Sequence, residues 1–408
     1  MGSMRGHGWV LRGLAGAGCL AVMAAVTACA GAAPGASPAA APRATVSQPG
    51  GPAAPLVVAT AVVPAGTTGA HKPGTATARA TASRPPAGQG ALPAAGNPDG
   101  DAAVPAAGQA VDTSHPDHVI GDGTAASCTQ AAVTTAVAAG GVITFSCGPA
   151  PVTITMTAAA TVPVSSHLVV LDGGGKVTLS GGGRTQILTV NGGWQQQWPR
   201  LVVQNLTFTD AYSGTRQVSG SSVYGGGAIF AEGGQLTVAN STFTGDSCYA
   251  SGPDLGGGAI RALGMDPASP VYITGDTFTG DSCSNGGALS GLFAHFDVIN
   301  CLMTGDKAIG FGANPAQAGT PGGGSGGAIY TDGTGYDLDV SGTVMRGDTA
   351  REGGGGIFFV VNSGGGTLRI QSSTLQDNPS GEFQNAPGIF DSVNGQDTQP
   401  VLVGSSVQ

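Results

Sequence analysis

LTVANSTFTGDSC, at residues 236–248, returns thirty-five positions later as VYITGDTFTGDSC, at residues 271–283. Both stretches alternate apolar and polar residues, place Asn or Gly fifth, and end in TFTGDSC. Alternation turns one side of a short strand toward a core, and a fixed spacing of this length indicates repeated structure. These residues therefore predict an all-β fold built from stacked copies of one unit.

The same pattern, apolar-x-apolar-x followed by a small or polar residue, occurs eight times in the C-terminal two thirds of the chain. The fifth position suits the left-handed backbone of a tight corner. In six copies another apolar residue follows three places later, so each copy reads as strand, corner, strand. The copies begin at Leu168, Leu201, Leu236, Val271, Phe296, Leu338, Leu368 and Val401. The corners are expected at Asp172, Asn205, Asn240, Gly275, Asn300, Gly342, Ser372 and Ser405.

A third, glycine-led strand precedes each copy from the third onward, as in GGGAIF at residues 225–230 and GGAIY at residues 326–330. Three short strands per copy predict one coil of a solenoid, whereas a propeller blade needs four. The starts lie 25 to 42 residues apart. Such variation belongs in loops that leave one side of a stack.

This alignment resembles the right-handed parallel β-helix of pectate lyases, polygalacturonases and the Gly-Gly-Ala-Ile repeat proteins of bacterial surfaces. The resemblance covers residues 128–408 and implies about eight three-strand coils behind a short N-terminal capping helix. Asn205, Asn240 and Asn300 match the asparagine ladder of that family, with Gly275 interrupting it.

The cysteines add two expected cross-links. Cys248 and Cys283 hold the same position in adjacent copies, and stacked strands about 4.8 Å apart suit a disulfide. In the chain-entropy model such a bond contributes about 4 kcal/mol. Cys128 and Cys147 bracket the capping segment and form the second expected pair, which leaves Cys301 as a buried free thiol.

The N-terminal segments predict export. Residues 1–29 place two arginines before an apolar run that ends in small residues, as an export signal does. The tetrapeptide ending at Cys29 resembles the bacterial lipobox, which implies lipidation there and a cell-surface lipoprotein; plain secretion is the alternative. Residues 30–117, rich in Ala, Pro, Gly and Thr, are expected to be a disordered stalk, and residues 118–408 the folded domain.

The charge pattern limits the partners. Only 10% of the residues are charged, and the net charge of −9 comes without a basic cluster, so we expect no nucleic acid partner. No segment after the signal holds about eighteen consecutive apolar residues, so no later span is expected to cross a membrane. The expected partners are a polysaccharide or cell-surface component, and the membrane through the lipid anchor at Cys29.

The glycine-led strands offer one candidate binding face. Alternation turns one column of residues outward: Phe230, Arg261, Ser290, Tyr330, Phe358 and Phe390. Aromatic rings beside a guanidinium suit stacking on sugars and pairing with a carboxylate. In the resembling enzymes this strand lines the substrate groove, and their lyases use an arginine as base, which implies that role for Arg261. The alternative is that long loops bury the rings.

Acidic residues near this column are sparse. Glu232 and Asp332 fall three coils apart, about 14 Å, too far for one metal or a glycosidase pair. Glu232, Asp332 and Asp254 are therefore only accessory candidates for a lyase. A second acidic column follows the corners and could hold Ca²⁺ or bond to backbone, so neither a metal site nor a cofactor is assigned. Its members are Asp246, Asp281, Asp306 and Asp348.

Trp194 and Trp198, in the loop NGGWQQQWPR, fit either a sugar platform or a hydrophobic plug. Three hypotheses remain for function. The first is a non-enzymatic surface protein that binds a polysaccharide. The second is a polysaccharide lyase or hydrolase, and the third is a rigid spacer without a ligand.

Overall fold

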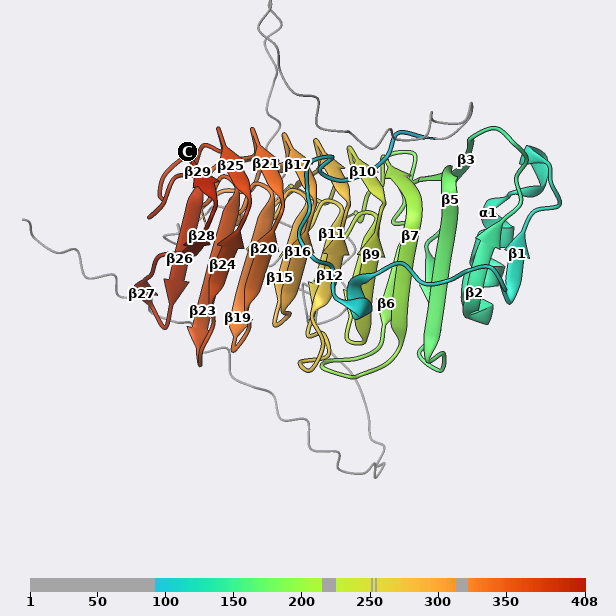
Figure 1. Ribbon diagram of the computed structural model, residues 1–408, viewed down its shortest axis with the longest axis horizontal. Coiled ribbons are helices and arrows are strands. Elements are labelled where there is room, and N and C mark those ends of the chain that lie inside the picture. Colours follow the sequence, from blue (N-terminus) through green and yellow to red (C-terminus); the bar gives the residue numbers. More distant parts are fainter. Residues whose placement is uncertain (1–91, 215–224, 251, 254, 313–321) are drawn as a thin grey trace, which may run out of the picture. The chain divides into compact units, whose positions relative to one another are not determined.

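Parallel β-strands dominate the computed structural model, which describes residues 92–214, 225–250, 252–253, 255–312 and 322–408 (Figure 1). These residues belong to one compact unit, Pro86–Gln408. The strands form three stacked sheets, an arrangement compatible with a β-helix-like fold. Within the described ranges, no helix has the length and apolar character needed to span a membrane. The predicted signal, the lipid site at Cys29 and residues 30–91 of the stalk lie outside the described residues.

The largest sheet, sheet A, carries both strands of the predicted strand-corner-strand pattern. Each strand pairs in parallel with the equivalent strand one copy away, and β5 and β7 are long enough to serve both rows. The strands of sheet A are β1 (His118–Ile120), β2 (Gly141–Phe145), β3 (Val152–Thr155), β5 (Leu168–Ser180), β7 (Arg200–Thr209), β9 (Gln235–Ala239), β10 (Thr242–Thr244), β12 (Val271–Thr274), β13 (Thr277–Thr279), β16 (Phe296–Ile299), β17 (Leu302–Thr304), β20 (Leu338–Ser341), β21 (Val344–Arg346), β24 (Leu368–Gln371), β25 (Thr374–Gln376), β28 (Val401–Val403) and β29 (Ser406–Val407).

Sheet B collects the glycine-led strands, and sheet C is a narrow third sheet. The strands of sheet B are β4 (Ala160–Val162), β6 (Leu188–Asn191), β8 (Ile229–Glu232), β11 (Ile260–Leu263), β15 (Leu289–Leu292), β19 (Ile329–Thr334), β23 (Ile357–Ser363), β26 (Ile389–Val393) and β27 (Gln396–Asp397). Those of sheet C are β14 (Ser282–Cys283), β18 (Lys307–Ala308) and β22 (Thr349–Ala350). Among the described strand pairs only β26 and β27 run antiparallel.

The register confirms the internal copies and corrects the two at the ends. Leu201 pairs with Leu236, as the alignment predicts. In the first copy, however, Val169 and not Leu168 pairs with Leu201. In the last copy Val401 pairs with Arg369 instead of Leu368. Both end copies contain an unbroken apolar run, in which alternation cannot say which residue faces the core.

The positions of the corners are also confirmed in the internal copies and corrected in the two end copies. Left-handed backbone is present at most expected positions, namely Asn205, Asn240, Gly275, Asn300, Gly342 and Ser372. In the end copies the left-handed residues are Gly174, Gly175 and Gly404 instead of Asp172 and Ser405. Glycine and asparagine adopt this conformation at the least cost, which explains why they recur there.

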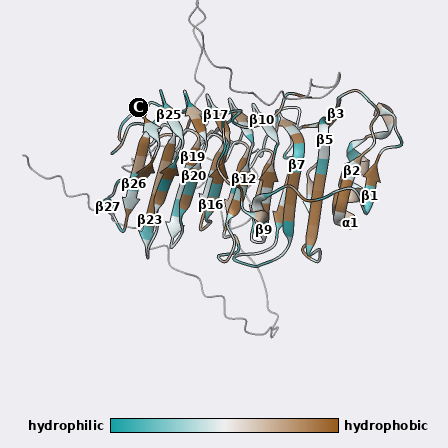
Figure 2. Ribbon diagram, viewed as in Figure 1, coloured by the Kyte–Doolittle hydropathy of each residue, from teal (hydrophilic) through white to brown (hydrophobic). Residues whose placement is uncertain are grey.

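Identical positions of successive copies stack to form the core (Figure 2). The rings of Phe208, Phe243 and Phe278 are fully buried and parallel, with centroids 4.9 and 4.8 Å apart. Met303 and Met345 continue the column in the next two copies. The apolar side of each strand therefore packs mainly against its own equivalents one copy away.

A short helix is present where the capping segment was predicted. Helix α1 (Gln130–Ala139) starts at Thr129, whose side chain accepts the Ala132 N–H, and ends at Gly140 in a left-handed conformation. Two short 3₁₀ helices precede it, η1 (Ala106–Gly108) and η2 (Ala125–Ser127). Both predicted disulfides are present, with Cα–Cα distances of 5.7 Å for Cys128–Cys147 and 4.7 Å for Cys248–Cys283. Cys301 is free and buried.

Residues 92–117, which composition assigns to the stalk, form a strap across the outer face of sheet A (Figure 1). Side chains of the sheet satisfy its backbone groups: Gln204 bonds to both the N–H and the C=O of Val111, and Asn300 does the same for Ala102. A chain poor in large side chains is thus held by its backbone. The folded part begins before the predicted boundary at residue 118.

Candidate functional site

The outward column of sheet B has the predicted order. Arg261 pairs with Phe230 on one side and with Ser290 on the other, and Tyr330 pairs with Ser290 and Phe358. Phe390 completes the column beside Phe358. The structure therefore brings the predicted residues of the column together on neighbouring strands.

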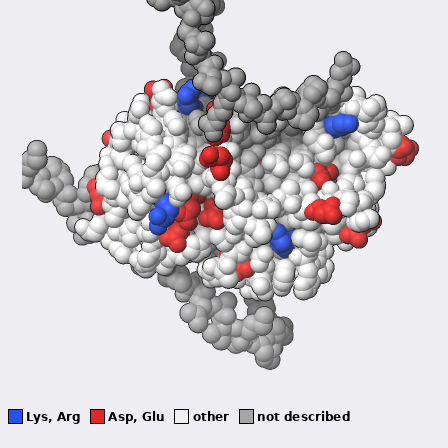
Figure 3. All heavy atoms as spheres, viewed as in Figure 1, with Lys and Arg blue, Asp and Glu red and all other residues white. Residues whose placement is uncertain are grey.

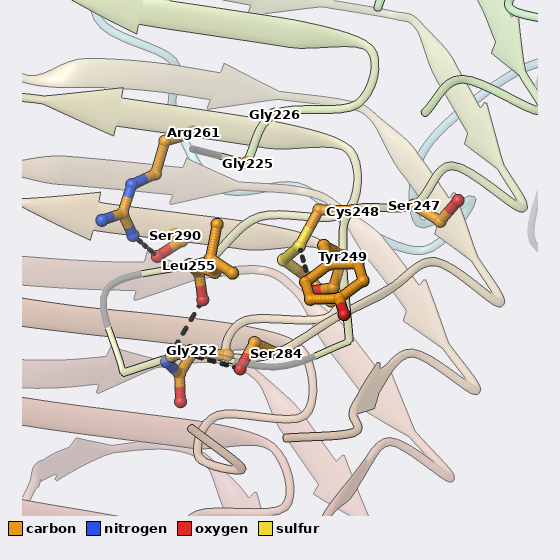
Figure 4. Close-up of a disulfide and its surroundings, with 12 residues drawn as sticks. Gly225, Gly226, Ser247, Cys248, Tyr249, Gly252, Leu255, Arg261, Ser284 and Ser290 are labelled. Atoms are coloured by element: carbon orange, nitrogen blue, oxygen red, sulfur yellow. Dashed lines mark hydrogen bonds between the residues drawn. A yellow bond between two sulfur atoms is a disulfide. The ribbon is translucent and has the colours of Figure 1, made fainter. Parts of the chain in front are cut away.

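The middle of this column is covered. Arg261 and Ser290 are fully buried, and the Arg261 guanidinium donates to the Ser290 hydroxyl (Figure 4). Gly256 lies against both groups, so a side chain there would collide with them. Gly256 lies in the connection between Cys248 and β11, inside the loop that the Cys248–Cys283 disulfide closes. The alternative that loops bury this face therefore describes Arg261, which has no open path to a polymer in this conformation.

The aromatic residues of the column pack on one another. Tyr330 and Phe358 stack with centroids 5.0 Å apart and are almost completely buried. Phe390 stacks on Phe358 at 5.3 Å and meets Phe383 edge to face at 4.8 Å. Phe230 and Phe390, at the two ends of the column, remain half-buried. These rings form a small core outside the sheet instead of an open platform.

The accessory carboxylates do not converge. Glu232 pairs with Leu263, and Asp332 pairs with Leu292 and Val360, so the two acids stay three strands apart as expected. Asp332 accepts hydrogen bonds from Tyr330 at 3.2 Å and from Asn362 at 2.6 Å. Asp254 lies outside the described residues.

The column of Gly-Asp corners is internal. Its four aspartates are fully buried, and each accepts a hydrogen bond from a backbone N–H of the preceding copy. These bonds fit the predicted role of bonding to backbone better than the predicted role of binding Ca²⁺. No cluster of three or more His, Cys, Asp or Glu side chains with metal-binding geometry occurs in the described part of the chain.

Exposed aromatic residues occur instead on the turn at residues 192–199, between β6 and β7, here called the tryptophan turn. Its backbone is anchored by bonds from the Gln195 N–H to Gly264 and from the Gly234 N–H to Gln196. Gly233 and Gly234 lie directly against it, and a Cβ at either would collide with backbone of the turn. The two glycines of the next copy therefore allow the turn to lie flat on the edge of the stack.

Both tryptophans of this turn are fixed by an aromatic partner. Trp194 is 45% exposed, and its ring meets Phe293 at 5.0 Å, nearly edge to face. Trp198 is 38% exposed and packs on His167 at 4.7 Å. Each ring thus keeps a solvent-exposed surface while its aromatic neighbour fixes its orientation. Recognition by stacking requires this arrangement.

Amides supply the polar groups of the turn. Gln195, Gln196 and Gln197 are all exposed between the tryptophans, and residues 192–199 contain no charged side chain. An amide offers both donors and an acceptor, which matches the hydroxyl groups of a sugar. The exposed surface of Trp194 and Trp198 fits the predicted sugar platform better than the predicted hydrophobic plug.

A groove of about 460 Å³ lies on the outer face of sheet A, between the strap and β16, β20 and β24. Asp297, Asp339 and Arg369 occupy equivalent positions on these neighbouring strands and line it. Arg369 pairs with Asp339 at 3.4 Å. Charges are otherwise scattered over this face, where Figure 3 shows one group of acidic atoms beside a basic one.

The two carboxyl groups of the groove differ in acidity. Burial raises the pKa of Asp297 to about 6, and repulsion from Asp339 and Asp337 adds to the effect. Burial also raises the pKa of Asp339, but Arg369 opposes that shift. Sequence reasoning missed this pair, although FDVIN and LDVSG place an aspartate second in successive copies. The composition of residues 92–117 did not predict that they would form the strap that completes the groove.

The comparisons with known proteins add no relative. No family model, no curated protein and no solved structure matches this chain.

Proposed function

We propose that this protein is an exported, non-enzymatic parallel β-helix that binds a neutral polysaccharide through the tryptophan turn. The observation that carries the proposal is the pair of exposed rings, Trp194 and Trp198, each held by an aromatic neighbour. Stacking on fixed aromatic rings is the usual way a protein binds the apolar face of a sugar.

The proposed architecture is the right-handed, pectate-lyase-like coil of three strands, with about eight coils. It is supported by three parallel sheets in which equivalent residues of successive copies pair. A rod of this kind presents its turns in rows along one edge. A linear polymer would then be able to run along the row that contains the tryptophan turn.

The charge pattern favours a neutral polymer. The exposed polar groups of the turn are amides, and the chain as a whole carries a net charge of −9. A polyanion such as pectate or alginate would meet general repulsion and no cation on residues 192–199. Hydrogen bonds from amides to hydroxyls require no charge on the ligand.

Export to the cell surface is part of the same proposal. The two disulfides suit an oxidising compartment, and the N-terminal sequence has the features of a lipoprotein signal ending at Cys29. The Ala, Pro, Gly and Thr-rich segment would then carry the folded part away from the membrane.

Co-sedimentation of the full chain with insoluble cellulose and chitin, and gel retardation in pectate and alginate, tests the proposal. Trp194→Ala and Trp198→Ala should each weaken binding to a neutral polymer by about tenfold. Tyr249→Ala is the matched control, because Tyr249 is 41% exposed and follows the disulfide-bonded Cys248, outside residues 192–199. Absence of binding to every polymer would leave the spacer hypothesis, and binding that ignores both tryptophans would refute the site.

A second candidate function, hydrolysis of a glycosidic bond, is favoured by the groove. Asp297 and Asp339 pair on adjacent strands, whose spacing of about 4.8 Å is close to the carboxyl separation of about 5 Å used by retaining glycosidases, and Asp297 has the raised pKa of an acid. Release of reducing ends by the wild type, lost in Asp297→Asn and kept in Asp377→Asn at an exposed aspartate, would support it. The buried Arg261 gives the lyase hypothesis less support.

A further inference from the structure

The internal aspartate column consists of Asp246, Asp281, Asp306 and Asp348, none of which has exposed surface. One oxygen of each side chain, Oδ1, accepts a backbone N–H from the copy before it. The donors are Ala211 at 2.8 Å, Asp246 at 2.7 Å, Asp281 at 2.8 Å and Asp306 at 2.8 Å. The column is therefore continuous, with each aspartate bonded through its carboxyl group to one copy and through its N–H to the next.

The second oxygen of every member, Oδ2, is buried and has no hydrogen-bond partner. Four ionised carboxylates at the spacing of stacked strands would repel one another along the column. A buried charge without a counter-ion is among the costliest arrangements in a protein interior, and such groups generally take up a proton instead.

The next copy shows what fits at this position. Asn378 follows Asp348 in the column, and its Oδ1 accepts the Asp348 N–H at 3.0 Å. Its Nδ2 donates to the Met345 carbonyl at 3.2 Å. A protonated carboxyl group resembles this amide, with one accepting oxygen and one donor, whereas an ionised carboxylate has no donor.

The charges around the column do not offset it. Asp210, exposed at one end, repels Asp246, and the members repel one another. Lys307 and Arg346, on adjoining strands, are exposed to solvent. Burial raises the pKa of Asp246 and of Asp348 to about 8, and those of Asp281 and Asp306 well above the ordinary range.

We propose that this column is a proton-binding element, whose four carboxyl groups are protonated in the folded protein near neutral pH. Folding then takes up protons, and the domain is most stable in mild acid. The inference is independent of any bound polysaccharide.

The direction of the pH dependence follows from the linkage between proton binding and folding. The folded state holds protons that the unfolded chain releases above its ordinary aspartate pKa of about 4. The contribution is complete below that value and is lost as pH rises through the folded pKa, about 8 for the two end members. Within this window each bound proton changes the unfolding equilibrium constant by about tenfold per pH unit.

Denaturant unfolding of the full chain at pH 5, 6, 7 and 8 tests the proposal when wild type and variants are compared. Asp281→Asn removes one bound proton, so the pH dependence of its unfolding equilibrium constant should be weaker than that of the wild type by about tenfold per pH unit. Asn378→Asp adds a carboxyl group to the column and should make that dependence steeper. Asp377→Asn is the matched control, because Asp377 is exposed and adjacent to Asn378. Infrared spectra at neutral pD should show a protonated-carboxyl band that is weaker in Asp281→Asn.

Two experimental outcomes would contradict the proposal. If Asp281→Asn leaves both the pH slope and the infrared band of the wild type unchanged, the column is ionised and the proposal fails. Should that variant not fold, Asn378→Asp still decides. If Asn378→Asp lowers the free energy of unfolding equally at pH 5 and pH 8, the proposal is overturned. If it lowers that free energy only at pH 8, the proposal is supported.

Discussion

Two aromatic groups of this molecule point away from the central core, and they differ in how much of their surface meets solvent. In the outward column of sheet B, Tyr330 and Phe358 are buried under loops and neighbouring rings. In the tryptophan turn, Trp194 and Trp198 remain open. The difference teaches that the strand sets the direction of a side chain, whereas the adjoining loops set its exposure.

The loops beside the two groups explain the contrast. On the side of sheet B near Arg261, the connection between β10 and β11 is long, and Gly256 of that connection lies against the guanidinium and the Ser290 side chain. Beside the tryptophan turn the next copy has only Gly233 and Gly234 between β8 and β9. A two-residue connection has nothing with which to cover the rings.

The largest effect is expected from Phe358→Ala. Because this ring is buried between Tyr330 and Phe390, its removal should lower the free energy of unfolding by about 3 to 5 kcal/mol. Denaturant unfolding measures the loss, and polysaccharide binding should be unchanged. Loss of binding with unchanged stability would mean that the column, and not the turn, is the platform.

Removing the Cys248–Cys283 disulfide by paired serine substitutions should cost about 2 to 4 kcal/mol, since the bond closes a long loop. It should also loosen the segment that covers Arg261. Proteolysis between Cys248 and Gly256 would report that change. If protection from protease persists in the variant, the cover does not depend on the disulfide.

A smaller effect is expected from Ser290→Ala. The serine hydroxyl accepts a bond from a buried guanidinium, and hydrogen bonds to charged groups contribute about 1.5 to 3 kcal/mol. Thermal and denaturant unfolding would detect the change. A loss within error would show that the other contacts of Arg261 compensate.

The smallest effect on stability is expected from Trp194→Ala, about 1 kcal/mol or less, because nearly half of the side chain is already in water. Its effect on polysaccharide binding should be large by comparison. The opposite outcome, a large loss of stability with unchanged binding, would identify the residue as the plug that the sequence also allowed.

The sequence predicted the stacked β architecture and most of its register, because identical spacing imposes identical pairing. Phe243 and Phe278 stack as the alignment requires, and the disulfide at Cys248 follows from the same argument. The end copies were displaced by one residue because LVVL and VLV lack alternation.

The candidate site was less predictable. Exposure depends on loop paths, which periodicity does not encode, so the sequence left an exposed and a buried alternative open for both Arg261 and Trp194. The strap was missed because residues 92–117 are poor in large apolar side chains. They are held by backbone bonds to Gln204 and Asn300, and composition gives no sign of those contacts.

The strap also bears on the order of folding. The Asn97 side chain bonds to Gly342, 245 residues further along the chain. During synthesis the N-terminal segment emerges long before β20 exists, so it must wait while the later copies assemble. Closing contacts of such long range is slow, which makes the docking of this segment a late event that seals an already finished stack.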